Sequence, residues 1–356
     1  MIDRIIDFSV KNKFIIFALT AVACVAGWWS MKHMALDAIP DLSDTQVIIY
    51  SRWDRSPDIM EDQVTYPIVS AMVGAPKVKA VRGFSDFGYS YVYVIFEDGT
   101  DIYWARSRTL EYLSSVLPKL PEGVKTEIGP DATPLGWIFQ YALVDETGKQ
   151  SLADLRTYQD WYLKYYLKAV PGVAEVAPVG GFGKQYQVNV DPNRLLAYGI
   201  PISRVVEAVR DGNYESTGRL IEFGGAEYNI RGRGYLRSLQ DLEEIAVGTG
   251  ESGTPIRIKD IGQVVLGPDI RRGIADLDGK GEVVSGIVIM RHGQNALDVI
   301  RRVKEKLHEI EPGLPPGVKV IPIYDRSDLI LRSIDNLKST LIEELITVAL
   351  VVFLFL

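Results

Sequence analysis

The sequence is poor in the residues that build most catalytic and metal-binding centres. Its 356 residues include one cysteine, Cys24, and three histidines. A single cysteine excludes an internal disulfide framework and any cysteine-based zinc cluster. His33, His292 and His308 are scattered, and no serine lies in a nucleophile elbow. We therefore expect neither enzyme chemistry nor a cofactor, and we interpret Cys24, inside an apolar run, as a small buried hydrophobe.

Runs of basic residues are missing as well. Lys and Arg number 39 against 46 Asp and Glu, which gives a net charge of −7. Nucleic-acid binding needs a basic patch or stripe, so nucleic acid is excluded as a partner. The six methionines are equally dispersed. Thioethers favour Cu(I) and Ag(I), but Met60 and Met72 would lie about 120° apart around one regular helix. We expect no metal site within this chain.

Charged residues are absent from one long stretch near the N-terminus. Residues 14–31 are uncharged and would span about 27 Å as a helix, close to the thickness of a bilayer core. A cleavable signal peptide is the alternative, but its apolar region is shorter and ends in small residues. This run ends near Trp28 and Trp29, residues typical of a membrane interface. The pattern predicts a transmembrane helix over residues 14–34.

The charges that flank this helix predict its orientation. Basic residues precede it and acidic residues follow it, namely Arg4, Lys11 and Lys13 and then Asp37, Asp41 and Asp44. By the positive-inside rule the N-terminus is cytoplasmic and the main body lies outside the membrane. Residues 1–13 are interpreted as an amphipathic segment on the cytoplasmic surface, with a frayed start as the alternative.

The C-terminal residues predict the beginning of a second span. Residues 345–356 carry no charge and are followed by no cap or turn, so the chain is expected to end inside a helix. We assign residues 338–356 to the start of this second transmembrane helix.

The body opens with a strand-helix-strand-strand-helix-strand order. The expected strands are 46–52, 78–84, 89–96 and one from about residue 124, and the expected helices are 57–72 and 101–117. This is the ferredoxin-like βαββαβ pattern. The fold class is therefore α+β, attached to membrane helices.

A second set of the same elements follows the first. It starts with a strand at 137–144 and a helix at 152–168, and residues 314–319 copy residues 120–125. The interval from Gly99 to Leu120 is 21 residues, and that from Gly293 to Leu314 is also 21. Chance similarity of short motifs is the alternative, which the equal spacing opposes.

The two copies differ in the middle. Pro76 to Gly99 is 23 residues, whereas Pro171 to Gly293 is 122, so about 99 residues are added. The predicted domains are 38–132 for the first copy, 133–181 with 275–335 for the second, and 182–274 for an inserted domain.

The insert contains a strong hairpin signal. Residues 219–223 and 227–231 flank Gly224-Gly225, a two-glycine turn. We interpret the pair as a projecting arm, and a hairpin lying flat on its own domain is the alternative.

Two apparent ligand motifs are explained better as turns. Residues 248–253 fit G-x-G-x-x-G, but a predicted strand follows at 255–258, where dinucleotide binding needs a helix. Asp276, Asp278, Gly279 and Glu282 hint at a calcium loop, but their spacing does not match an EF-hand.

Several long runs carry a resemblance to a known family. They are residues 37–44 with 46–47, 61–67, 81–85, 91–101, 103–108, 129–133 and 324–327. Across essentially the whole chain, the sequence resembles the N-terminal portion of heavy-metal efflux pumps of the resistance-nodulation-division (RND) superfamily.

This resemblance implies a homotrimeric, proton-driven cation antiporter of the bacterial inner membrane, with its main body in the periplasm. The two copies would be porter subdomains and the insert a docking subdomain. The partners would be a periplasmic adaptor (membrane fusion protein), an outer-membrane channel, the lipid bilayer and the exported metal ion. The family's metal-binding methionines and acidic proton relay lie in later segments, so the resemblance assigns no metal, proton-relay or catalytic residue here.

The resemblance also implies roles for two groups of residues. The arm would reach a neighbouring protomer through Arg219, Leu220, Phe223, Gly224, Gly225 and Tyr228. The helix that carries Asp101, Tyr103, Trp104 and Arg108 would face the central pore of the trimer.

The function expected from this resemblance is export of Cu(I) or Ag(I). Co/Zn/Cd-type efflux within the same family is one alternative. A membrane-tethered periplasmic binding or adaptor module is another, although such a module has no use for an uncapped return helix.

The predicted orientation can be tested with topology reporters. A reporter that is active only in the periplasm should be active when fused after Gly250 and silent when fused after Val10, because only the first site is outside. A cytoplasm-specific reporter at the same two sites serves as the control. The reverse pattern would contradict the orientation.

Overall fold

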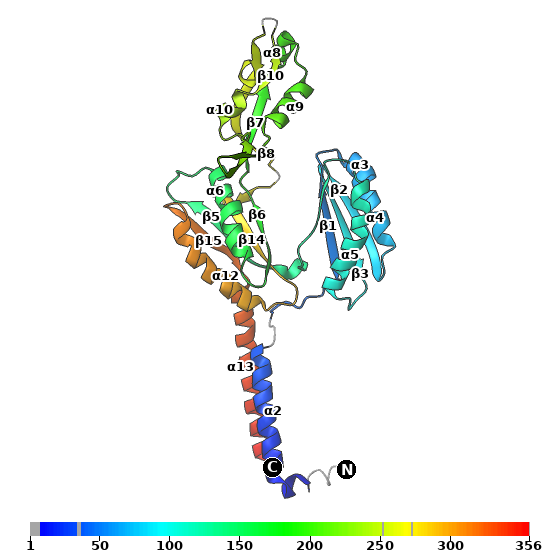
Figure 1. The fold of residues 1–356 in the computed structure, drawn as a ribbon. Helices are drawn as coiled ribbons and strands as arrows, with labels where there is room; N and C mark the ends of the chain where they lie inside the picture. The colour runs from blue at the N-terminus through cyan, green and yellow to red at the C-terminus, as the bar shows by residue number, and fades with distance from the viewer. Residues whose placement is uncertain (1–7, 34–36, 251–252, 272, 356) are drawn as a thin grey trace. The chain divides into compact units, whose positions relative to one another are not determined.

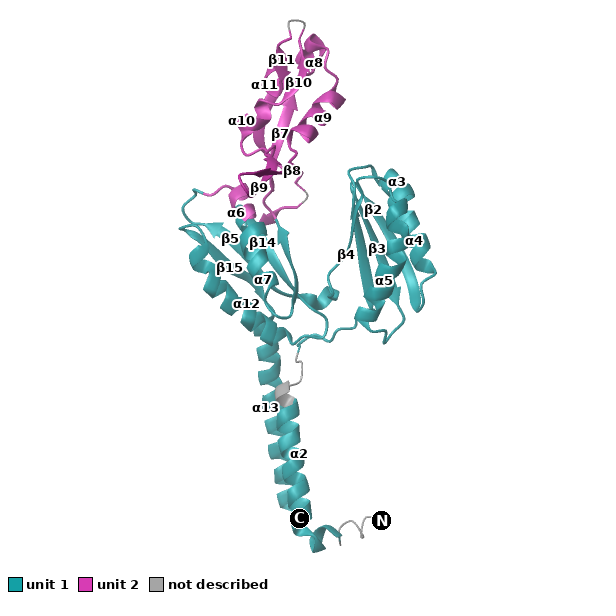
Figure 2. Cartoon of the chain, viewed as in Figure 1, with its two compact units in different colours: residues 1–149, 158–179, 277–356 teal, residues 150–157, 180–276 magenta. Residues whose placement is uncertain are grey.

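The computed structural model describes residues 8–33, 37–250, 253–271 and 273–355. The chain divides into two compact units. Unit 1 comprises residues 1–149, 158–179 and 277–356, and unit 2 comprises residues 150–157 and 180–276 (Figure 2). The interpretation of residues 1–13 as an amphipathic segment falls in large part on residues 1–7, which lie outside the described residues.

The N-terminal helix agrees with the sequence prediction. Helix α2 runs from Lys13 to His33, and among the described residues it is the one helix long and apolar enough to cross a membrane. Twenty-one residues correspond to about 32 Å. Cys24 is exposed on this helix, so the expectation that protein buries it is wrong. An apolar side chain on a membrane helix is shielded by lipid and does not need a protein core.

The first sheet has four antiparallel strands in the order β2-β3-β1-β4. The strands are β1 Gln46–Arg52, β2 Val78–Asp86, β3 Tyr89–Phe96 and β4 Lys125–Ile128. Side chains of β1 and β3 alternate between buried and partly exposed, the period that a sheet with one covered face requires. The predicted bounds of β1 and β3 are confirmed.

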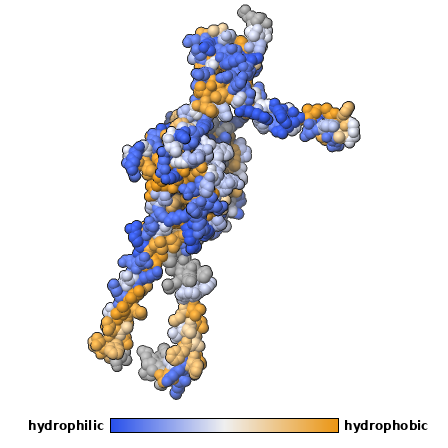
Figure 3. Space-filling view, turned by 90° about the vertical axis from the view of Figure 1, so that its left-hand side faces the viewer, coloured by the Kyte–Doolittle hydropathy of each residue, from blue (hydrophilic) through white to orange (hydrophobic). Residues whose placement is uncertain are grey.

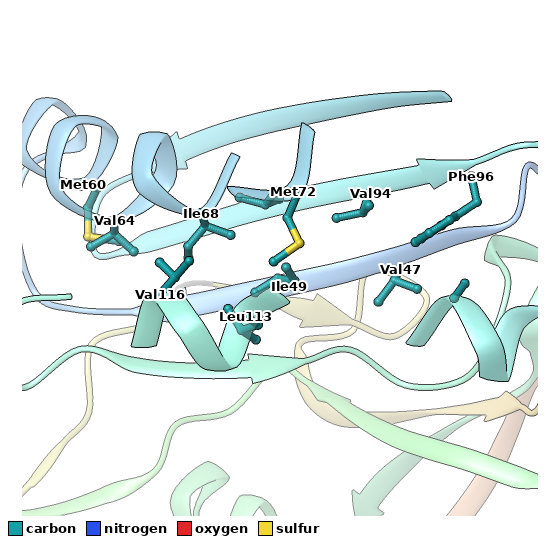
Figure 4. Packing of buried hydrophobic residues seen from close by; sticks show 12 residues of the cluster. Val47, Ile49, Met60, Val64, Ile68, Met72, Val94, Phe96, Leu113 and Val116 are labelled. Atoms are coloured by element: carbon teal, nitrogen blue, oxygen red, sulfur yellow. The ribbon is translucent and has the colours of Figure 1, made fainter. Parts of the chain in front are cut away.

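Two helical segments cover the buried face of this sheet. The first consists of α3 Pro57–Met60, the π-helical turn η1 Glu61–Thr65 and α4 Tyr66–Val73. The second is α5 Ile102–Val116, which continues into the 3₁₀ turn η2 Leu117–Lys119. Figure 4 shows their side chains pointing toward those of the strands in one core.

Met60 and Met72 are both fully buried in this core. A separation of about 120° holds for a regular α-helix. The intervening π-turn contains an extra residue per turn, so the estimate for a regular helix does not apply to this segment. The interpretation of both as core residues is confirmed.

The second sheet repeats the first strand order. Its strands β5 Trp137–Asp145, β6 Val173–Val179, β14 Glu282–Met290 and β15 Val318–Asp325 pair in the order β6-β14-β5-β15, all antiparallel. A short fifth strand, β13 Ala275–Asp276, also pairs with β14. The helical segment after β5 consists of α6 Leu152–Tyr158, the π-turn η4 Gln159–Leu163 and α7 Lys164–Lys168. Helix α12 Ala296–Ile310 and the turn η5 Glu311–Gly313 precede β15.

The two copies differ between their second and third strands. Strands β2 and β3 are joined through Phe87 and Gly88, whereas β6 ends at Val179 and β14 begins at Glu282. The additional residues therefore replace a two-residue hairpin turn.

Unit 2 has its own core, which includes Val205, Leu242, Val247, Ile258 and Ile261. It contains β7 Lys184–Val190, α8 Pro192–Tyr198, α9 Ile202–Gly212, α10 Leu239–Glu243, β10 Ala246–Thr249, β11 Pro255–Arg257, α11 Ile258–Ile261, β12 Gly262–Pro268 and β13 Ala275–Asp276. Strands β10 and β11 pair antiparallel, so residues 248–253 connect two strands as predicted and do not begin a helix.

The hairpin signal also corresponds to a real hairpin. Strands β8 Ser216–Phe223 and β9 Ala226–Gly232 pair antiparallel, and every residue in both is exposed. Gly224 and Gly225 join them with φ of 63° and 77°, which suits the type I′ turn favoured in two-residue hairpins. We call β8, β9 and this turn the arm.

The chain closes with helix α13, Arg326–Phe355. Its large apolar side chains are exposed from Leu345 to Phe355, where the sequence analysis places the start of a second span. Figure 1 shows both α2 and α13 extending from the second sheet's side of the chain.

Deleting residues 182–274 and inserting a short linker should leave a protease-resistant unit 1. Strands β6 and β14 already pair antiparallel, so a short turn should join them as Phe87 and Gly88 join β2 and β3. Limited proteolysis with mass spectrometry measures the protected fragment. A matched deletion that extends through β14 should lose protection, and loss of protection by both deletions would contradict the domain prediction.

Candidate functional site

Helix α5 positions the residues predicted to face a pore. The side chain of Asp101 accepts a 2.8 Å hydrogen bond from the backbone N–H of Trp104 and caps the helix. An aspartate in this position satisfies an orphan donor of the first turn and suits the helix dipole. Asp101 is therefore a structural residue of the helix start, whatever the helix faces.

Trp104 of helix α5 packs against the first sheet. Its ring lies edge-on to Phe96, with centroids 6.3 Å apart, and is partly buried against the first core. The Nζ of Lys77 lies 4.9 Å from the Trp104 ring centroid, and the Arg108 guanidinium lies 5.9 Å from it. Arg108 also forms a 2.6 Å ion pair with Glu111. Trp104 and Arg108 are thus brought together.

Tyr103 makes a different connection. Its hydroxyl donates a 3.1 Å hydrogen bond to Asp131 Oδ2, in the linker that leads from the first sheet to the second. Burial raises the pKa of Tyr103, and the hydrogen bond to the Asp131 carboxylate raises it further. One turn on, Arg106 Nη1 donates a 2.6 Å bond to the backbone oxygen of Gly129 in the same linker. Helix α5 therefore holds the linker at two points.

A polar junction forms where this linker meets two other segments of unit 1. Thr133 Oγ1 donates a 2.6 Å bond to Asp41 Oδ2, and the backbone N–H of His292 donates a 3.0 Å bond to the oxygen of Asp131. A hollow of about 330 Å³ lies here, lined by Asp37, Asp41, Thr133, Met290, His292 and Gln294 among others. Burial opposes ionisation of Asp41, but bonds from Thr133 and Ser43 outweigh it and lower its pKa.

Arg326 is the buried centre of this junction. Its side chain is 4% exposed and forms a 3.1 Å ion pair with Asp37. Nη2 donates a 2.9 Å hydrogen bond to the backbone oxygen of Trp137, the first residue of β5. Arg326 is also the first residue of α13, and Asp37 follows α2 closely in the chain. One guanidinium thus connects the exit of α2, the second sheet and the start of α13.

The neighbouring Asp325 fixes the start of α13. It forms an ion pair with Lys304 of α12 and accepts two bonds from Ser327, from the backbone N–H at 2.9 Å and from the hydroxyl at 2.6 Å. Burial acts to raise the pKa of Asp325, but Lys304 and Ser327 more than compensate, and the pKa is lowered. The carboxylate is the form that this arrangement stabilises.

The arm residues predicted from the resemblance are fully available for contact. Leu220, Phe223 and Tyr228 are 61%, 76% and 56% exposed. Gly224 and Gly225 form the turn, and Arg219 lies on β8. The alternative of a hairpin lying flat on its own domain is wrong, because a covered face would bury every second residue.

In the part of the chain that the structure describes, no group of three or more His, Cys, Asp or Glu side chains could hold a metal ion. Asp276 ends β13, and Asp278 and Gly279, with φ of 57° and 67°, lie in the turn that leads to β14. Their arrangement is that of a turn between strands.

Sequence reasoning missed the junction. Asp37 and Arg326 are 289 positions apart, and no periodicity or motif spacing links them. The available signal was indirect, since both residues lie in runs that carry the family resemblance. The sequence could have suggested the pair in one way. A charged residue at the start of one long helix, here Arg326 of α13, can be compared with the residues of opposite charge that follow the other long helix.

The structure thus has a long apolar helix and two similar antiparallel sheets, the second interrupted by a long insert. The model of the AcrB/AcrD/AcrF family matches residues 5–356, so the chain belongs to this family.

Its relatives are heavy-metal efflux proteins. The chain is 53% identical to the cation efflux system protein CusA of Escherichia coli K12 and 52% identical to the putative cation efflux system protein SilA of Salmonella typhimurium. Both alignments cover all of this chain and 34% of the relative. The crystal structure of a heavy metal efflux pump superposes with a TM-score of 0.86 at 31% identity, over 97% of this chain and 35% of the pump. The chain thus spans about a third of the relatives it matches.

Replacing Asp37 with Ala should destabilise the junction strongly. Removing Asp37 leaves the buried Arg326 guanidinium without its carboxylate partner, and because Asp37 itself is partly exposed the cost is about 1–3 kcal/mol, below that of a fully buried pair. The control is Asp335→Ala, which removes the exposed Asp335–Lys338 pair and should cost about 0–1 kcal/mol. Denaturant unfolding followed by tryptophan fluorescence measures both, and equal losses would contradict the assignment. Asp37→Leu combined with Arg326→Met should recover most of the loss, because it leaves no unpaired charge.

Proposed function

We propose that this chain is the N-terminal portion of a proton-driven RND pump that exports Cu(I) or Ag(I) across the bacterial inner membrane. The observation that carries the proposal is its 52–53% identity, over its whole length, with SilA and CusA. The cobalt-zinc-cadmium resistance protein CzcA of Cupriavidus metallidurans is 37% identical. Co/Zn/Cd-type efflux is therefore the second candidate, supported at lower identity.

Within this pump, residues 38–132 form a first ferredoxin-like porter subdomain, and residues 133–181 with 275–335 form a second. Residues 182–274 form a docking subdomain inserted into the second. The repeated strand order supports this division: β2-β3-β1-β4 in one sheet and β6-β14-β5-β15 in the other. The body lies in the periplasm, between one span at 14–34 and the start of another at 338–356.

The assembly is a homotrimer that works with a periplasmic adaptor and an outer-membrane channel. The arm, with Arg219, Leu220, Phe223, Gly224, Gly225 and Tyr228, contacts the adjacent protomer. Helix α5, with Asp101, Tyr103, Trp104 and Arg108, faces the central pore. Full exposure of the arm supports the first assignment. Exposure of Tyr103 at 51% and Leu110 at 55% on α5 supports the second.

Proton coupling depends on parts of the pump other than this chain. An ionisable group within the bilayer is the usual mark of a proton path. Residues 14–31 contain none, and Glu343 and Glu344 precede the apolar run of α13. We assign these two glutamates to the membrane interface, as solvated charges at the helix end.

The metal assignment can be tested with chimeras. Substituting this chain for the N-terminal third of CusA should preserve silver and copper resistance in a sensitive strain that lacks its own pump. The same substitution in CzcA should give weaker zinc, cobalt and cadmium resistance. This chain is less similar to CzcA, so fewer of its residues would match those that contact the remaining two thirds of CzcA. Growth across metal concentrations is the measurement.

The chain alone should give no resistance in the same strain, and this is the baseline. Resistance restored in the CzcA chimera but not in the CusA chimera would favour the second candidate. Resistance from the chain alone, abolished by Glu343→Ala or Glu344→Ala, would overturn the assignment of these glutamates and favour an independent module.

A further inference from the structure

Unit 2 contains a hollow whose walls all come from this one unit. Its volume is about 530 Å³, within the range of about 300–1,000 Å³ that is typical of small-molecule sites. Strand β7, the end of helix α9, helix α10 and the segment before α10 form its walls. The lining residues are Tyr186, Val188, Val209, Arg210, Asn213, Leu236, Ser238 and Leu242.

The floor of this hollow is apolar because it belongs to the outer layer of the core of unit 2. Tyr186 and Val188 are alternate residues of β7 and therefore face the same side of the strand. Val188, Val209 and Leu236 are partly buried and pack against the core, which includes Leu242. Figure 3 shows hydrophobic residues at the surface of unit 2 beside hydrophilic ones. In the hollow, such residues form a concave surface.

The polar residues of the hollow are hydrogen-bond donors. The guanidinium of Arg210 forms no ion pair or hydrogen bond with any residue in the described ranges. Asn213 Oδ1 accepts a 3.1 Å hydrogen bond from the backbone N–H of Leu236, and none of the described residues accepts a bond from the Nδ2 of this amide. Ser238 Oγ accepts a 3.1 Å bond from the backbone N–H of Asp241 and can still donate its proton.

Acidic residues do not compete for these donors. The described residues that line the hollow include no Asp or Glu, although acidic residues outnumber basic ones in the chain by 46 to 39. Asp241 precedes the lining residue Leu242, but its carboxylate is already bonded. Its Oδ2 accepts hydrogen bonds of 2.8 Å and 3.0 Å from the backbone N–H groups of Arg237 and Ser238. The hollow therefore combines an apolar floor with an unpaired positive charge, which favours an anionic ligand over a cationic one.

Arg210 also has a structural role. It lies in the last turn of α9, where a positive charge interacts favourably with the helix dipole. That interaction requires only a charge near the end of the helix and does not depend on what occupies the hollow. An experiment that detects the ligand directly can therefore distinguish the two roles.

We propose that this hollow binds an amphiphilic carboxylate of the fatty-acid class. The guanidinium of Arg210 and the amide of Asn213 hold the carboxylate, and the hydrocarbon chain lies on the apolar floor. A guanidinium can donate two parallel hydrogen bonds to one carboxylate, and each buried CH₂ group adds about fourfold to affinity. This ligand is chemically unlike the metal ion of the proposed pump, and the inference does not depend on metal export.

Photo-labelling of the full chain in lipid nanodiscs tests the proposal. The probe is a dodecanoic acid that carries a diazirine in its chain and an alkyne for enrichment, and mass spectrometry locates the labelled peptides. We expect label on peptides that contain Val188, Val209 or Leu236. The same probe reaches the apolar helix α2 from the bilayer, which gives a reference yield in each sample. An excess of unmodified dodecanoate should remove the label from the hollow.

Charge variants test the part of Arg210. Arg210→Glu should reduce the labelling of the hollow at least about tenfold relative to α2, because a hydrogen bond between charged groups contributes that much to affinity. Arg210→Lys keeps the charge and should retain most of the label. The matched control is Arg204→Glu, which changes an exposed arginine on the same helix that does not line the hollow. Circular dichroism of each variant checks that the chain remains folded.

A second probe separates a specific site from general affinity for apolar surfaces. The corresponding dodecanol probe lacks the carboxylate, so it should label α2 equally and the hollow about tenfold less. Equal labelling of the hollow by both probes, or labelling that Arg210→Glu leaves unchanged, would overturn the proposal. Label on α2 alone would also overturn it and would indicate that a protein segment covers the hollow. Each of these results leaves the proposed pump function intact, because none of them measures metal resistance.

Discussion

The pairing of β6 with β14 is the constraint on which the second half of this fold depends. In the first sheet the equivalent strands, β2 and β3, are joined by Phe87 and Gly88 alone. In the second sheet, 102 residues intervene between Val179 and Glu282. A disordered connection of that length would carry a closure entropy that grows by about 0.6 kcal/mol with each doubling. The sheet avoids most of this cost because the inserted residues fold.

The insert brings its own ends together. Strand β7, its first strand, pairs along its whole length with β12, one of its last, from Lys184 opposite Pro268 to Val190 opposite Gly262. The backbone N–H of Asp269 also donates a 2.8 Å bond to the oxygen of Gly183. The pairing within the insert therefore holds its entry and exit next to each other. This arrangement lets a sheet accept a whole domain at a hairpin turn, and it explains why the flanking strands keep the order found in the uninterrupted copy.

Features governed by local pattern were predictable from the sequence, and those set by distant contacts were not. Alternation in β1 and β3, the glycine turn of the arm and the spacing of the repeat depend on neighbouring residues, and their positions agree with the structure. The π-turns within both crossover segments could not be foreseen from a 3.6-residue period, so the angle expected between Met60 and Met72 for a regular helix does not apply. The prediction for Cys24 was wrong for another reason: it lies on a long apolar helix, and an apolar sequence pattern does not show whether other parts of the chain cover the residue.

The contacts of Arg326 could not be predicted from the sequence, although the run that contains Arg326 was identified there. Arg326 takes its role from Asp37, 289 positions earlier, and from a backbone oxygen of Trp137, which has no side-chain signature at all. The first sheet makes a comparable connection, since Arg106 bonds to the oxygen of Gly129 just after β4. In both copies an arginine thus holds the backbone beside a strand end, at the place where the chain leaves one element for the next. The repeat therefore contributes two similar sheets, and these arginine-to-backbone bonds connect the second sheet to the start of α13 and α5 to the linker between the sheets.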